Sequence, residues 1–214
     1  MLNEVKNQVT QGQGPARASG GFETVTVDGH ARFQQAVLAG NAFWCATQTA
    51  GTSQAGLSAT TPVLTLYNPK GNNKAAVLWY AGASFIVAFA AGSAVWIAAN
   101  INVAAAAVSG TAVSGVTSVA IVTNAQLGNG SFPTCIPLTA ATLPAAPVAV
   151  RQLASGLTGA ITTIPYVGSV GGWQDGSLVL LPGSAISIQT STASGAGMFC
   201  DYGWEEIPLS WLNA

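Results

Sequence analysis

The residues able to do chemistry in this 214-residue chain are few and scattered, beginning with a single histidine, His30. Zinc sites and cupin-type metal centres rely on several histidines held together, which this chain cannot supply. His30 could act as a general base, but its position at the start of an expected helix favours a helix-entry role. The sequence therefore predicts no metal site and no cofactor.

The carboxylates offer little more for acid–base chemistry. A glycosidase needs two carboxylates across a sugar, and Asp175, Asp201 and Glu205 are the late residues that folding could bring together. Glu205 and Glu206 are adjacent, so on a strand they would point to opposite faces. The motifs G-x-S-x-G and G-x-x-x-x-G-K-[ST] do not occur. The chain is predicted not to be an enzyme, with a hydrolase or calcium site at the late trio as the alternative.

Cys45, Cys135 and Cys200 lie far apart and match no zinc-ligand spacing. An odd number of cysteines is a poor framework for disulfides. Buried free thiols that behave as small apolar residues are the favoured interpretation. One long-range disulfide with a spare thiol is the alternative.

Charge is the most unusual property of the composition. Charged residues make up 6% of the chain, against about a quarter in ordinary soluble domains. The basic residues form no cluster that could neutralise phosphates, so no nucleic-acid partner is expected. Either polar uncharged side chains finish the surface, or other protein covers much of it. We expect a protein that assembles with copies of itself and with partner subunits.

A membrane partner is not expected either. The N-terminus has no apolar segment typical of a secretory signal. Residues 85–108 are uncharged and long enough to span a bilayer, which leaves a membrane helix as an alternative. However, this segment is rich in alanine and contains Asn100 and Asn102, which are costly in a membrane.

The chain divides into residues 1–40, a polar N-terminal arm with a short helix, and residues 41–214, a β domain. In the first part, Glu23–Val27 could form a short strand, and apolar spacing predicts a helix over His30–Leu38 that stops at Ala39-Gly40. In the second part, turn residues separate short apolar segments. Strands are predicted over residues 42–49, 62–67, 75–80, 84–89, 94–101, 116–123, 177–181, 186–191 and 198–204.

Two details of this pattern carry the fold prediction. Residues 62–67 and 75–80 flank a polar turn and predict a hairpin. Residues 186–191 and 198–204 alternate with the period of two typical of half-buried strands. Many short strands and one helix predict an all-β protein, an antiparallel β-sandwich or jelly roll with an extended N-terminal arm.

Aromatic side chains are the remaining candidates for recognition. Trp44, Trp79 and Trp96 lie in apolar segments and are expected to pack in the core. Trp173 and Trp211 lie in expected loops, where exposed tryptophan favours contact with a neighbour or a glycan. The candidate partner-binding residues, including those of the arm, are Arg17, Phe22, Arg32, Phe33, Trp173 and Trp211.

Several short motifs add a resemblance. They are R-F-x-x-A at Arg32–Ala36, L-Y-N-P-x-G at Leu66–Gly71, the P-G turn at Pro182–Gly183 and W-E-E-I-P at Trp204–Pro208. Over residues 30–80 and 175–208 the chain resembles small structural proteins of tailed bacteriophages. This resemblance implies a jelly-roll fold and trimers on the virion, as capsid cement (decoration) proteins or as fibre and spike components.

The expected function follows from the resemblance and the low charge together. The chain is expected to be a non-enzymatic virion structural protein, a trimeric capsid cement protein that binds and stabilises major capsid subunits. Its expected location is the capsid surface, after synthesis in the host cytoplasm without secretion. The alternative is a tail fibre or spike component that binds a host-surface glycan through exposed aromatic residues.

Overall fold

A computed structural model describes residues 17–18, 24–25 and 33–212, the last range with gaps at 88, 90–91, 102–107, 158–167, 194 and 196. In the arm, β1 (Arg17–Ala18) pairs with β2 (Thr24–Val25) in antiparallel fashion. β2 therefore confirms the central part of the strand predicted over Glu23–Val27. The predicted helix start at His30 lies outside the described residues.

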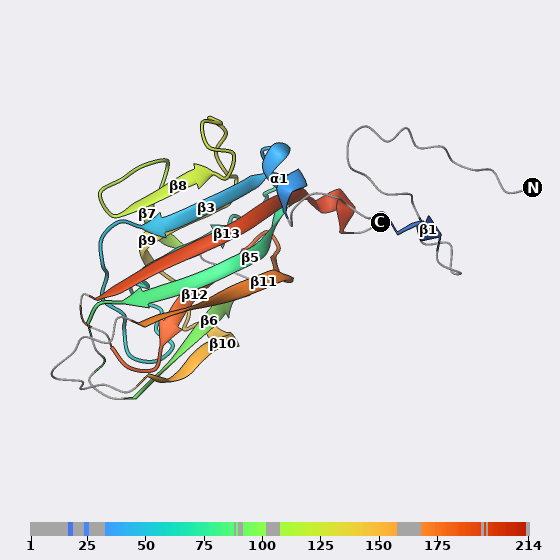
Figure 1. The fold of residues 1–214 in the computed structure, drawn as a ribbon. Helices are drawn as coiled ribbons and strands as arrows, with labels where there is room; N and C mark the ends of the chain where they lie inside the picture. The colour runs from blue at the N-terminus through green and yellow to red at the C-terminus, as the bar shows by residue number, and fades with distance from the viewer. Residues whose placement is uncertain are drawn as a thin grey trace, which may run out of the picture.

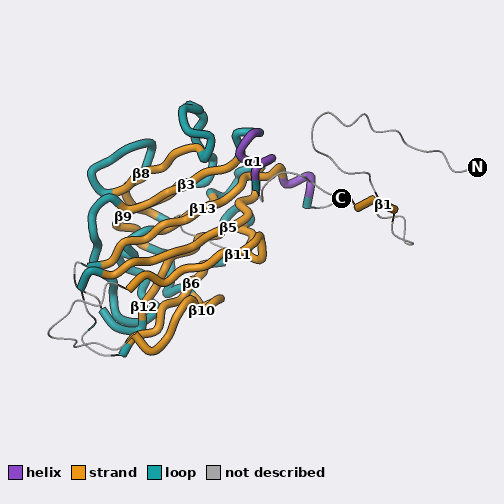
Figure 2. The backbone as a smooth tube through the Cα atoms, in the orientation of Figure 1, coloured by secondary structure: helices purple, strands orange, loops and turns teal. Residues whose placement is uncertain are grey.

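Two antiparallel sheets pack face to face and form a β-sandwich (Figure 1). The five-stranded sheet has the order β11 (Gly168–Leu180), β5 (Lys74–Phe85), β13 (Met198–Pro208), β3 (Ala42–Thr47) and β8 (Ala120–Asn124). The six-stranded sheet has the order β10 (Val148–Leu157), β6 (Ser93–Asn100), β12 (Ser184–Thr190), β4 (Thr65–Asn68), β9 (Ile136–Thr142) and β7 (Ser109–Ala112). Strands dominate the described chain (Figure 2), which confirms the prediction of an all-β sandwich.

The short helix α1 (Gln34–Leu38) lies at the end of the sandwich where β3 begins and β13 ends (Figure 1). It ends as predicted, since the Ala39 amide donates to the Gln35 carbonyl and Gly40 follows with a φ of 73°. The helix begins later than predicted. Phe33 has a left-handed backbone (φ 64°), so the helical conformation starts only at Gln34.

The core lies between the sheets and confirms the predicted alternation at the end of the chain. Met198, Cys200, Tyr202 and Trp204 on β13 all point into it. Tyr202 is fully buried, and its hydroxyl donates to the Leu64 carbonyl at 3.3 Å. Burying the ring while satisfying its hydroxyl is the usual solution for tyrosine in a core.

The predicted hairpin of residues 62–67 and 75–80 is wrong. β4 belongs to the six-stranded sheet and β5 to the five-stranded sheet, so residues 69–73 carry the chain from one sheet to the other. The apolar residues of both strands face the shared core, which period-two alternation alone does not distinguish from pairing in one sheet. The buried Asn68 amide fixes the crossing by donating to the Lys74 carbonyl at 3.0 Å and the Leu180 carbonyl at 2.8 Å.

Other strand predictions need correction in length or number. The separate strand predicted over 84–89 is wrong, because β5 runs without interruption to Phe85 and the chain then bends. β7, β9 and β10 were not predicted. Their sequences contain Ala, Gly and Pro, which are depleted in strands, so their pairing partners decide the conformation.

β12 is buried on both faces, whereas half-burial was predicted. Ser187 and Gln189 point away from the core, and Gln189 donates to the Ser187 hydroxyl at 2.8 Å. The Ser58 amide donates to the Gln189 side-chain carbonyl at 3.3 Å, so the loop before β4 covers this part of the sheet. A polar residue in an alternating strand can therefore face protein instead of water.

The alanine-rich segment considered as a membrane span contributes the strand β6. Within the described part of the chain, no helix is long and apolar enough to cross a membrane.

Candidate functional site

A β-bulge in β5 places two aromatic residues side by side on the outer face of the five-stranded sheet. Tyr80 pairs with Gly203 of β13, but the next paired residues are Leu78 and Trp204, so Trp79 is the extra residue. Alternation is interrupted there, and Trp79 and Tyr80 both lie outside the sandwich core. Bulges commonly redirect side chains near binding sites.

The strand register then lines up aromatic residues across the sheet. Trp173 of β11 pairs with Tyr80, Tyr80 with Gly203, and Gly203 with Trp44 of β3. We call Trp44, Tyr80, Trp173 and Phe33, which joins them from the helix, the aromatic face. Ring centroids lie 5.7 Å apart for Trp44 and Tyr80, and 5.5 Å apart for Tyr80 and Trp173.

The rings of Trp44 and Tyr80 lie on the sheet and form the floor of the site, and the Trp173 ring stands upright beside them and forms its wall. Trp44 lies over Gly203, where an added Cβ would come within 2.8 Å of the indole. Tyr80 lies over Gly82 and Gly171 in the same way, with its hydroxyl 2.6 Å from an added Cβ at Gly171. The Trp173 ring stands at 84° to Trp44 and at 71° to Tyr80. The glycines therefore let two rings pack onto the sheet while the third rises at its edge.

Phe33 supports the wall from behind. Its ring stacks on Trp79 at 4.3 Å and on Trp173 at 5.8 Å, with interplanar angles of 15° and 22°. Trp79 is buried in a small apolar cluster with Ala36 and Ala42, separate from the sandwich core. A left-handed backbone is costly for a bulky residue such as Phe33, and these stacking contacts offset that cost.

Asp201 brings a negative charge to the aromatic face. It pairs with Gly82 and with Ala46, one row beyond Tyr80 and Trp44, so it is diagonal to both aromatic residues. Its Oδ1 atom lies above Gly82, 2.5 Å from an added Cβ, in the space that the Tyr80 hydroxyl also approaches. Burial raises the pKa of Asp201, while burial and then the Asp201 charge raise the pKa of Tyr80.

The structure brings together two of the predicted partner-binding residues, Phe33 and Trp173, and leaves Trp211 apart. Trp173 is 52% exposed, as expected for a contact residue, but it lies in β11 and not in a loop. Trp211 is exposed on a 3-10 helix (Leu209–Trp211) and has no ring contact with the described aromatic residues. Arg17 lies in β1, while Phe22 and Arg32 fall outside the described residues.

The predicted core role is wrong for Trp44 and Trp96 but is confirmed for Trp79, which is buried in a separate small apolar cluster. Trp44 and Trp96 are half-buried on outer faces, and Trp79 is buried beneath Phe33 outside the main core. The sequence suggested Asp201 only as a carboxylate of a hydrolase or calcium site. The sequence shows the residues Trp44, Tyr80 and Gly203 but not that they lie side by side across the sheet. That arrangement depends on the strand order and on the bulge at Trp79.

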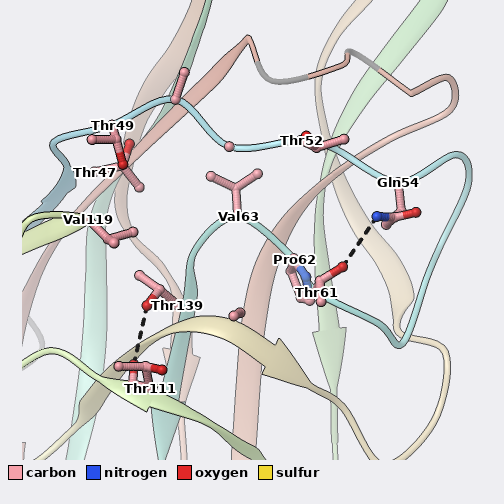
Figure 3. Close-up of a pocket in the computed structure, with 13 residues that line it drawn as sticks. Thr47, Thr49, Thr52, Gln54, Thr61, Pro62, Val63, Thr111, Val119 and Thr139 are labelled. Atoms are coloured by element: carbon pink, nitrogen blue, oxygen red, sulfur yellow. Dashed lines mark hydrogen bonds between the residues drawn. The ribbon is translucent and has the colours of Figure 1, made fainter.

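Apart from the aromatic face, a pocket of about 360 Å³ opens between the two sheets, near the end of β3 and beside β7 and β9 (Figure 3). Threonines dominate its lining, and Figure 3 shows Gln54 donating to the Thr61 hydroxyl and Thr139 donating to the Thr111 carbonyl. No lining residue is titratable. Acid–base or nucleophilic chemistry based on an ionisable group therefore has no support there.

The other candidate groups do not converge on a reaction centre. Asp201 and Glu205 are four residues apart on β13, about 13 Å along an extended strand, and no metal-binding group of three His, Cys, Asp or Glu occurs among the described residues. The three cysteines are buried free thiols, as predicted. Burial, followed by the Asp201 charge, raises the pKa of Cys45 to about 12, so this thiol is a poor nucleophile.

Comparisons with known proteins found no match to a family model, to a curated protein or to a solved structure. Two features of the molecule itself bear on its function: the aromatic face and the exposed edges of the sandwich.

Proposed function

We propose that this chain is a non-enzymatic structural protein of a virion, most specifically a trimeric capsid cement protein. It would bind and stabilise major capsid subunits from the capsid surface, with the N-terminal arm reaching a neighbouring subunit. The observation that carries the assembly role is the pair of long, nearly uncharged edge strands on one side of the sandwich.

β10 and β11 are the edges of the two sheets, and they contact each other along one side of the sandwich. Val148, Val150 and Val179 on these strands are 64%, 46% and 41% exposed. The one cation of the pair, Arg151, donates to the Ser177 hydroxyl at 3.0 Å. Monomeric proteins usually protect such edges with charge or proline, so a neighbouring subunit is a good candidate to cover this side.

The strand order supports a jelly roll. Consecutive strands β3 to β6 alternate between the sheets, and so do β10 to β13. They interleave as β3-β13-β5-β11 in one sheet and β4-β12-β6-β10 in the other, an order that fits the eight strands and two Greek keys of a jelly roll. β7, β8 and β9 are then an insertion that extends both sheets at the opposite edge.

The virion setting rests on the resemblance of the short motifs to tailed-phage structural proteins. Two of the motifs have clear structural roles. Leu66–Gly71 contains the buried Asn68 of the sheet crossing. Trp204–Pro208 contains Glu206, whose buried carboxylate accepts the Cys135 amide at 2.7 Å.

Light scattering on a sizing column tests the assembly role. We expect a trimer at three times the chain mass of 21.4 kDa. Val150→Lys with Val179→Lys should reduce the mass to that of a monomer, because lysines on the edges oppose pairing. Val116→Lys is the matched control, since Val116 is 77% exposed away from these strands. A monomeric wild-type protein, or a trimer unaffected by the edge lysines, would contradict the edge assignment.

Capsid attachment tests the location. Tagged protein should bind purified capsids that lack it and raise their melting temperature. Stable binding to tail fibres without binding to capsids would contradict the cement role.

Glycan recognition by a fibre or spike component is the second candidate, favoured by the exposed Trp173 beside Trp44 and Tyr80. Labelled protein should then stain host cells, and Trp173→Ala should reduce the staining. Absence of staining on every host that the virus infects would contradict it.

A further inference from the structure

The aromatic face combines three features of a recognition site. Its floor is made by Trp44 and Tyr80 over glycines, and its wall by Trp173, which is backed by Phe33. Trp173 remains 52% exposed despite its ring contacts. An aromatic wall at right angles to an aromatic floor can enclose a flat group on two sides.

The third feature is a carboxylate without a countercharge. The Asp201 carboxylate makes no hydrogen bond and no ion pair with any described residue. The sheet's lysine, Lys74, lies 3.5 Å from Glu206 instead. Glu205 adds to the negative charge, because it follows Asp201 on the same face of β13. A half-buried carboxylate beside electron-rich rings favours a positively charged occupant.

We propose that the aromatic face and Asp201 form a binding site for an arginine side chain presented by a partner protein. A guanidinium is planar, weakly hydrated and always charged, so it can stack on an indole while its N–H groups pair with a carboxylate in a bidentate manner. A lysine ammonium has the charge but no flat surface to stack. A neutral sugar could stack, but it would leave the charge of Asp201 uncompensated.

This site goes beyond the cement role, because it depends on no virion component. It lies on the outer face of the five-stranded sheet, and Trp173 is its one member on an edge strand, β11. The two proposals can therefore fail separately. Loss of arginine binding would leave the trimer mass unchanged, and a monomeric protein could still bind arginine through this face.

The test is an NMR titration of the tryptophan indole N–H signals in the full chain. The probe is blocked arginine (N-acetyl-arginine amide), compared with blocked lysine and methyl glucoside at equal concentrations and ionic strength. We expect saturable shifts at Trp44 and Trp173 with arginine, and no shift at the fully buried Trp204. Affinity for lysine should be lower by about threefold or more, because stacking is lost.

Asp201→Asn tests the carboxylate, since it keeps the shape and removes the charge. Arginine affinity should fall by about fivefold or more, as expected for a partly desolvated ion pair with cation–π support. Trp173→Leu, a change at an exposed ring, should weaken binding by a similar factor. Absence of saturable shifts, equal affinity in Asp201→Asn, or tighter binding of the glucoside than of arginine would overturn the proposal.

Discussion

The indole ring of Trp44 lies over the Cα atom of Gly203, its partner on the adjacent strand, where an added Cβ would come within 2.8 Å of the ring. An aromatic ring that covers a cross-strand glycine contributes packing that the glycine itself cannot provide. The same arrangement recurs at Tyr80, which covers Gly82 and Gly171. The aromatic face thus depends on the glycines as much as on the rings.

Gly203→Ala should displace the Trp44 ring and destabilise the fold. The free energy of unfolding should fall by about 1–3 kcal/mol, the usual cost of overpacking a filled space. Urea denaturation measures it. Gly130→Ala is the control, because an added Cβ at Gly130 meets nothing within 4 Å, and it should be neutral or slightly stabilising. Equal effects of the two substitutions would contradict the packing of Trp44 on Gly203.

Glu206→Ala should be more damaging than Glu206→Gln. The buried carboxylate accepts hydrogen bonds from the Cys135 amide at 2.7 Å and the Thr134 hydroxyl at 2.8 Å, and it pairs with Lys74. Removing it leaves a buried donor unsatisfied, at a cost of about 2–3 kcal/mol. Glutamine keeps one acceptor oxygen and should cost about half as much. Urea denaturation compares the variants, and equal losses would show that the hydrogen bonds contribute little.

Asp201 should make the folded state less stable as the pH rises. Burial raises the pKa of its carboxyl in the folded protein, so the folded state binds a proton more tightly than the unfolded state. The resulting stability is fully present below the ordinary pKa of aspartate and is lost as the pH rises through the raised pKa. Asp201→Asn should therefore gain a few tenths to about 1 kcal/mol of stability at neutral pH, since the site is partly solvated.

The measurement for Asp201 is the melting temperature of both proteins between pH 3 and pH 8. The advantage of Asp201→Asn should shrink at the acidic end, where the wild-type carboxyl is protonated. A constant difference across the range would show that the charge of Asp201 is not its cause.

The three thiols should stay unreactive until the protein unfolds. All are buried, and burial, with smaller contributions from Asp201 and Cys45, raises the pKa of Cys200 well above its ordinary value. Labelling with a disulfide reagent at pH 8 should be slow in buffer and should reach three thiols per chain in denaturant. Rapid labelling of one thiol in buffer would contradict the burial of that residue.

Much of the fold could be predicted because the strand signals were local. The alternation from Met198 to Trp204 identified a strand with one buried face, and the structure confirms it. The β4–β5 hairpin failed because adjacent strands can face each other across the core as readily as they can pair. β9 and β10 could not be found, since alanine and proline give little local preference for a strand.

The candidate site was only half predictable. Phe33 and Trp173 were each predicted to bind a partner, without any predicted contact between them. In the structure their ring centroids lie 5.8 Å apart. Trp44 and Tyr80 reach the same face through non-local pairing, because β13 pairs with β3 on one side and with β5, around the Trp79 bulge, on the other. A bulge depends on the partner strands, and one sequence carries no clear signal of it.

The interleaved strand order also governs how the protein can fold. β13, from residues 198–208, lies between β3 and β5, and β12 lies between β4 and β6. The first four strands of the sandwich therefore do not pair with one another. Each gains one neighbour from β8, β9, β10 or β11, and the two parts of each sheet join only when β12 and β13 arrive. Such non-local pairing makes folding slow, and a nascent chain would expose open apolar strands until its final segment leaves the ribosome. Helper proteins or early association with a partner subunit would have their greatest effect in that interval.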